Sequence, residues 1–143
     1  MALKRNAVSL GKVAMPEING SGLVAFRMSY TLTADLAAGD IIDLGFLPAD
    51  AVPVDLIFDH AALGAGTVSV GLLNEGKTDL TGTAWVTAVA VTAAGASRAD
   101  AGGLRAMATL AATELNRSVG AKIVTDTSAT SGEIGLTLYY RTR

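Results

Sequence analysis

The sequence predicts an all-β domain, an antiparallel β-sandwich of the jelly-roll type that follows an extended N-terminal arm. Residues 23–33 alternate strictly between larger apolar side chains and small or polar ones, and several later runs do the same. Turn residues separate these runs at short, regular intervals. No series of helical patterns alternates with the strands, which disfavours a parallel doubly wound sheet. An immunoglobulin-like sandwich is the alternative, although the chain has no cysteine for the usual core disulfide.

Residues 1–22 have no sustained periodicity. They contain Gly11, Pro16, Gly20 and Gly22, which interrupt both helix and strand patterns. We therefore expect an extended arm over residues 1–22 and a single sandwich domain over residues 23–143.

Three strands follow the first one at short intervals. They are expected over residues 41–47, 52–61 and 67–73, with turns at residues 38–40, 48–50 and 64–66 between them. Pro53 lies near the start of one of these strands and lacks an N–H group, which indicates a position at a sheet edge.

The middle of the chain has a weaker pattern. Residues 84–92 fit a strand or a short helix, and residues 93–103 are small, polar and glycine-rich, which predicts irregular structure. Residues 104–110 fit a strand with Leu104 and Leu110 inward, although their alanines favour a helix. Residues 115–125 and 134–141 alternate clearly again. The sequence thus predicts seven or eight strands.

The composition indicates a surface that other molecules cover. Half of the residues are apolar, whereas only 17% are charged, compared with about 25% in an average domain. Such a chain exposes many apolar side chains unless neighbouring molecules cover them. The net charge of −2 is spread without a basic cluster, so nucleic acid is not an expected partner. The most apolar stretch, residues 84–96, is too short to cross a membrane.

Residues for catalysis or metal binding are scarce. The chain has one histidine, His60, and no cysteine, so a zinc site with several such ligands is excluded. Asp59 is adjacent in the same strand and therefore points to the opposite face, away from the His60 ring. Asp55 and Asp59 share one sheet face but lack the acidic loop that calcium prefers. We expect no enzyme activity, no catalytic residue and no cofactor.

The arrangement of strands and turns resembles the small capsid decoration, or cement, proteins of tailed bacteriophages. The resemblance covers residues 23–141. Its segments are Tyr30-Thr31-Leu32, Ala38-Gly39-Asp40, Leu47-Pro48-Ala49, Gly64-Ala65-Gly66, residues 116–120 and residues 135–141.

This resemblance implies a jelly-roll subunit that binds the outside of a phage capsid and clamps neighbouring major capsid subunits. The implied partners are the major capsid protein and other copies of the chain, a homotrimer being favoured over a homodimer. The implied location is the virion exterior, after synthesis in the bacterial cytoplasm. The candidate capsid or subunit interface consists of Leu3, Lys4, Arg5, Val8, Leu10, Lys12, Val13 and Trp85.

Two other functions remain open at this stage. One is a carbohydrate- or receptor-binding module, for which the single tryptophan, Trp85, would be the natural aromatic platform, although it also suits a core or interface position. The other is a small structural protein of the phage tail or neck.

Overall fold

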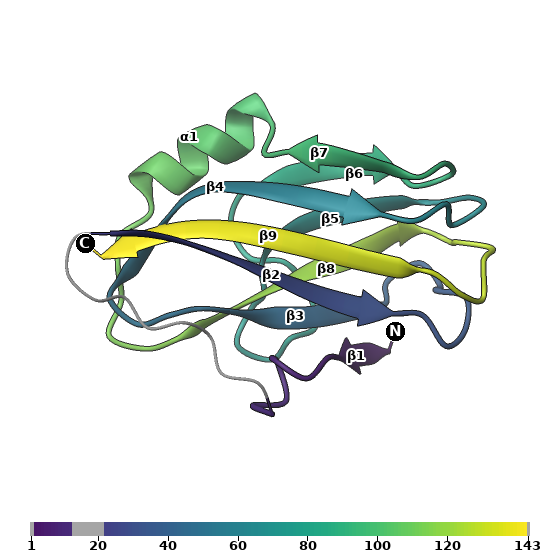
Figure 1. Ribbon diagram of the computed structural model, residues 1–143, viewed down its shortest axis with the longest axis horizontal. Coiled ribbons are helices and arrows are strands. Elements are labelled where there is room, and N and C mark those ends of the chain that lie inside the picture. Colours follow the sequence, from purple (N-terminus) through teal and green to yellow (C-terminus); the bar gives the residue numbers. More distant parts are fainter. Residues whose placement is uncertain (1, 13–21, 143) are drawn as a thin grey trace.

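Two β-sheets pack face to face in a computed structural model that describes residues 2–12 and 22–142 (Figure 1). One sheet has five strands in the order β1-β3-β8-β5-β6, and the other has four in the order β2-β9-β4-β7. The bounds are β1 Leu3–Arg5, β2 Leu23–Thr31, β3 Ile41–Leu47, β4 Ala51–His60, β5 Thr67–Leu72, β6 Val86–Ala90, β7 Gly95–Arg98, α1 Ala101–Thr109, β8 Arg117–Thr125 and β9 Glu133–Thr142.

The connections are those of a jelly roll. Strands β2 to β9 divide into two sets of four, and the chain changes sheet at every connection except that between β5 and β6. All pairs among these eight strands are antiparallel. The predicted all-β sandwich of jelly-roll type is confirmed.

The core lies between the two sheets and follows the predicted alternation. In β9, the inward side chains Ile134, Leu136, Leu138 and Tyr140 are fully buried. The central position of β9, between β2 and β4, explains this burial. The hydrophobic effect on these inward faces is the main stabilisation of the sandwich.

In residues 84–110 the structure selects one of the two alternatives predicted for the first part and differs from the prediction in the rest. The first part is a strand, β6, and the region expected to be irregular contains β7. The strand predicted over residues 104–110 is wrong, because this segment lies mostly in the helix α1. Asp100 caps the helix by accepting a hydrogen bond of 2.7 Å from the Gly103 backbone N–H. The alanines of residues 104–110 fit a strand as well as a helix, so the N-cap at Asp100 favours the helix.

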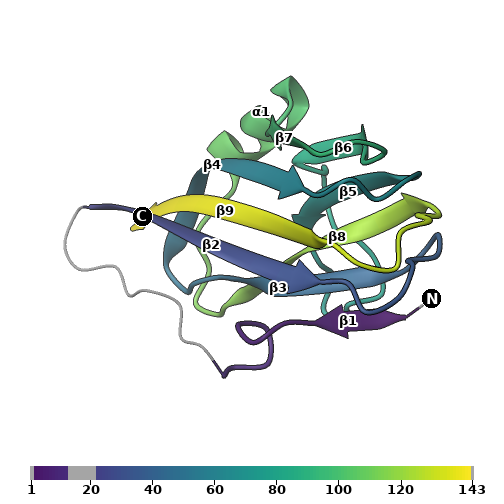
Figure 2. The same cartoon turned by 45° about the vertical axis from the view of Figure 1, so that its right-hand side comes forward.

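The helix lies beside the first half of β4 (Figure 2). Strand β7 pairs only with Ile57–His60, the second half of β4. The first half of β4 therefore has a strand partner, β9, on one side and none on the other. Pro53 lies in this half, as its missing N–H group predicts. Met107 of α1 is buried in the core.

The described N-terminal residues lie on the chain's own domain. Strand β1 pairs in parallel with β3, and Val8 is buried in the core. The Asn6 side chain donates hydrogen bonds to the carbonyl oxygens of Ser29 in β2 (2.8 Å) and Leu44 in β3 (2.7 Å). Asn6 and Val8 therefore close the sandwich between β2 and the part of β3 that lies beyond its pairing with β1.

Substitution of Asn6 tests this closure. We expect Asn6→Ala to lower the free energy of unfolding by about 1–3 kcal/mol, because two hydrogen bonds between the sheets are lost. Urea denaturation measures the effect. Asp35→Ala is the control, since its exposed side chain makes no hydrogen bond or ion pair within the described residues. Equal stability of the two variants would contradict a closing role for Asn6.

Candidate interaction surfaces

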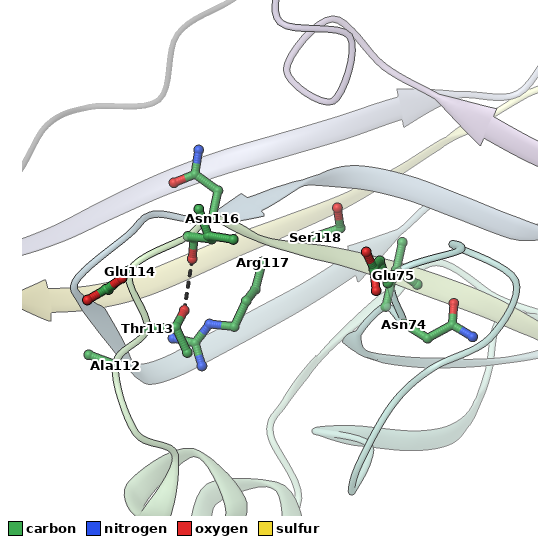
Figure 3. A pocket seen from close by; sticks show the side chains of 10 residues that line it. Asn74, Glu75, Ala112, Thr113, Glu114, Asn116, Arg117 and Ser118 are labelled. Carbon is green, nitrogen blue, oxygen red and sulfur yellow. Dashed lines mark hydrogen bonds between the residues drawn. The ribbon is translucent and has the colours of Figure 1, made fainter.

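A groove of about 800 Å³ lies at one end of the sandwich (Figure 3). One wall is the end of β5 and the residues after it, and the other is the linker between α1 and β8. The lining residues are Leu73, Asn74, Glu75, Ala112, Thr113, Glu114, Leu115, Asn116, Arg117 and Ser118. Its volume falls in the usual range of binding pockets, about 300–1,000 Å³.

Hydrogen bonds hold the linker wall to the turn between β3 and β4. The Ala49 backbone N–H donates to the Asn116 side-chain oxygen, and the Asp50 N–H donates to the Thr113 carbonyl, both at 2.8 Å. The Thr113 hydroxyl donates to the Leu115 carbonyl at 2.8 Å (Figure 3). This wall is therefore preorganised, and the Leu115 side chain is left 77% exposed.

Arg117 connects the groove to the start of β4. Its Nη1 donates to the Ala111 carbonyl (2.9 Å) and its Nη2 to the Ala51 carbonyl (3.1 Å), whereas its buried Nε has no partner among the described residues. Burial lowers the pKa of the Arg117 guanidinium below its ordinary value. Its hydrogen bonds are structural, because they join the linker to the start of β4 beside the bonds of Asn116 and Thr113.

The segment that covers the five-stranded sheet supplies the opposite wall of the groove. Residues 73–85 fold over the outer face of that sheet, and Lys77 places its Nζ 2.7 Å from a carboxylate oxygen of Asp43 in β3. Arg5 of β1 lies 3.6 Å from the same oxygen. The Asp43 side chain is only 1% exposed, and two cations beside its Oδ2 offset the cost of burying the charge, whereas its Oδ1 has no hydrogen-bond partner among the described residues. Asp43 thus fastens both β1 and the covering loop.

The predicted interface residues occupy different environments. Leu3 and Leu10 are exposed, and Lys4 is half-buried. Lys12 is exposed, whereas Arg5 is engaged with Asp43 and with the Ser9 carbonyl. Val8 is buried in the chain's own core, so its side chain offers little surface to another molecule. Val13 lies outside the described residues.

Trp85 lies in the core, which is one of the two positions that the sequence allowed for it. Only 2% of its surface is exposed, so Trp85 is neither a contact surface in this structure nor a platform for a sugar ring. The α1 backbone approaches it closely, because a Cβ atom at Gly103 would overlap the Trp85 carbonyl. Trp85 therefore anchors the helix to the sandwich.

The candidate catalytic residues stay apart. Asp59 points away from His60, as predicted, and its carboxylate pairs with Arg27 at 2.6 Å. His60 is buried beside Phe58, and its Nδ1 lies 3.1 Å from the Ala61 carbonyl. Asp55 pairs with Arg98. The described residues contain no cluster of acids and histidine that could hold a metal ion.

The part of the chain that the structure describes contains no helix long and apolar enough to span a membrane.

Sequence reasoning missed the groove. Its residues come from two segments, 73–75 and 112–118, that are far apart in the chain and carry no motif. The only signal is Leu115, an apolar residue between Glu114 and Asn116 in a turn-like segment.

Comparison with known proteins identifies the family. One chain in the capsid of Ralstonia phage GP4 is 32% identical to this chain, with 99% of this chain and 98% of that one covered and a TM-score of 0.80. This chain belongs to the same family as that phage capsid chain. A chain of the cyanophage Pam1 capsid has the same fold at a TM-score of 0.59 and 18% identity, with 92% and 93% of the two chains covered. Neither a family model nor a curated protein sequence matches.

Membership in this phage capsid family defines the class of function. The chain is a structural virion protein and not an enzyme.

Removal of the Arg117 side chain tests its structural role. We expect Arg117→Ala to lower the free energy of unfolding by about 1–3 kcal/mol, because the fully buried Ala51 residue loses a donor to its carbonyl. Chemical denaturation followed by circular dichroism gives the value. The control is Arg105→Ala, since Arg105 is exposed on α1 and makes no side-chain contact of this kind within the described residues. A result within 0.5 kcal/mol of zero, roughly the effect of an ordinary surface change, would contradict the assignment.

Proposed function

We propose that the protein is a capsid decoration protein, which binds the outside of the phage shell and holds neighbouring major capsid subunits together. One observation carries this proposal: a chain that belongs to a phage capsid family is a small sandwich domain that buries its own core. A domain that buries its own core folds before it attaches, as an added outer subunit must.

The surface supports attachment to other proteins. Apolar side chains with large exposed fractions include Leu115 at 77%, Leu23 at 60% and Leu10 at 46%. Exposed apolar side chains are favourable when neighbouring subunits cover them. Many symmetric copies make weak individual contacts strong together, which suits a clamp on a shell.

The N-terminal segment is the proposed contact with the shell or with another subunit. Strand β1 is the edge of its sheet and pairs with β3 on one side only. An open strand edge accepts an extended segment of another chain through backbone hydrogen bonds. We propose a trimer at local threefold positions of the shell, with a dimer at twofold positions as the alternative.

Binding to isolated shells tests the proposal. Purified protein mixed with expanded, undecorated capsids should bind until a fixed ratio to the major capsid protein is reached, and the decorated shells should resist a higher temperature before they break. Sedimentation with the shells and thermal light scattering measure the two effects. Absence of saturable binding, or binding only inside the shell, would refute the decoration role.

A pair of matched variants locates the contact. Leu3 in β1 and Val124 in β8 have nearly equal exposed fractions, 42% and 41%. If β1 forms the contact, Leu3→Asp should weaken shell binding about tenfold or more, because a charge is then buried at the interface, whereas Val124→Asp should leave it unchanged. Equal binding by both variants would exclude β1 from the interface.

A further inference from the structure

Most charged side chains of the described residues have an ion-pair or hydrogen-bond partner within the chain. Asp43, Asp55, Asp59, Asp79 and Glu133 form ion pairs. Asp40, Asp100 and Asp126 accept backbone hydrogen bonds, and Asp50 also has an interaction. The acids that have no such partner within residues 2–12 and 22–142 are Asp35, Glu75 and Glu114. Two of these three, Glu75 and Glu114, line the groove.

The unpaired cations gather in a different place. Arg5, Arg27, Lys77, Arg98 and Lys122 form ion pairs, Arg117 binds carbonyl oxygens, and Arg141 has an interaction. Within the described ranges this leaves Lys4, Lys12 and Arg105. Two of these three belong to the N-terminal segment, so the chain carries a surplus of positive charge there and of negative charge at the groove.

The N-terminal segment presents Lys12 on a hydrogen-bonded turn, residues 6–12, which we call the knob. Its backbone bonds include Leu10 N–H to the Asn6 carbonyl (3.0 Å) and Lys12 N–H to the Ala7 carbonyl (2.8 Å). The Asn6 side chain also accepts from the Ser9 N–H at 2.8 Å. Asn6 and Val8 hold the knob on the sandwich, and Leu10 and Lys12 remain exposed.

We propose that the knob of one copy occupies the groove of the next copy. Lys12 then lies between Glu75 and Glu114, and Leu10 packs on Leu115, so that charge and apolar surface match together. Within one chain the knob is fixed and forms no hydrogen bond or ion pair with the groove residues. The contact therefore joins separate copies.

This contact uses two different surfaces, so it is heterologous. Such contacts close into a ring when the rotation between copies permits it, and a threefold ring agrees with the proposed trimer. The inference rests on the proposed assembly role and adds the residues through which copies recognise one another.

Charge reversal tests the contact. Both Lys12→Glu and the double variant Glu75→Lys/Glu114→Lys should raise the apparent dissociation constant of self-association about tenfold or more at low salt, because each creates repulsion. The variant with all three changes should recover most of the affinity. Light scattering after size-exclusion chromatography gives the masses, and raising the ionic strength to about 1 M should weaken the wild-type contact.

Two unpaired charges outside the knob and the groove provide matched controls. Asp35→Lys and Arg105→Glu reverse an exposed acid and an exposed cation that lie in neither surface. They should leave the mass unchanged. At concentrations where the copies are separate, thermal unfolding of every variant should stay within a few degrees of wild type, since none of the replaced side chains has a hydrogen-bond or ion-pair partner within its own chain among the described residues. Equal loss of association in the control variants would show a general charge effect and overturn the proposal.

Mixing distinguishes this contact from a symmetric one. Lys12→Glu has an intact groove, and Glu75→Lys/Glu114→Lys has an intact knob. Their mixture should associate with the two variants alternating, because the unchanged knob fits the unchanged groove and the reversed knob fits the reversed groove. Three alternating copies cannot close a threefold ring. A wild-type protein that remains monomeric up to about 0.1 mM, where a micromolar contact is fully occupied, would overturn the inference.

The shell assay separates this inference from the proposed function. If monomeric protein decorates shells at a fixed ratio, the decoration role stands and the knob–groove contact fails. If the protein forms charge-dependent oligomers that ignore shells, the contact stands and the decoration role fails.

Discussion

The packing of the two inner sheet faces is the constraint on which the rest of the structure depends. The most buried side chains come from the central strands β8 and β9 and from their neighbours. A jelly roll pairs strands that are far apart in the sequence. Neither sheet is therefore stable until most strands of both sheets have formed. The core must therefore be closed on every side, and the sandwich has an open side between β2, the edge of one sheet, and the part of β3 that β1 leaves unpaired.

The N-terminal segment closes that open side. Val8 contributes an apolar side chain, and Gly45 leaves the space for it, since a Cβ atom there would overlap the Met28 sulfur and crowd Val8. Asn6 satisfies one carbonyl oxygen in each sheet. Because the same short segment also presents Leu10 and Lys12 to solvent, core closure and the proposed contact between copies are physically coupled. A copy whose N-terminal segment is not docked lacks a preorganised knob.

The strands with alternating large side chains could be predicted from sequence, but the middle of the chain could not. In β9, leucine and isoleucine alternate with polar residues, and only a strand places them on one face. In residues 104–110 the inward positions include alanines, which are small enough for either structure, and a single cap at Asp100 makes the difference. Strand β1 was missed because three residues are too few to show a period.

The interaction surfaces were harder to predict for a different reason. Lys12 and Leu10 could be selected by their position in a basic, unpatterned terminus, whereas Glu75 and Glu114 become neighbours of one groove only after folding. Trp85 shows the converse problem, because a large aromatic residue suits a core and an interface equally well until its burial is known.

The sheet edges explain why assembly would use the N-terminal side of the sandwich. At the opposite side, Ala88 of β6 has a positive φ of 48° and its N–H donates to the Ser69 hydroxyl, which breaks the regular edge. Such irregularities prevent pairing with another chain. Strand β7 is short, with four residues, whereas β2 runs for nine residues in unbroken register with β9. The side that carries β1, β2 and the knob is therefore the one whose regular strand edges remain open to a neighbour.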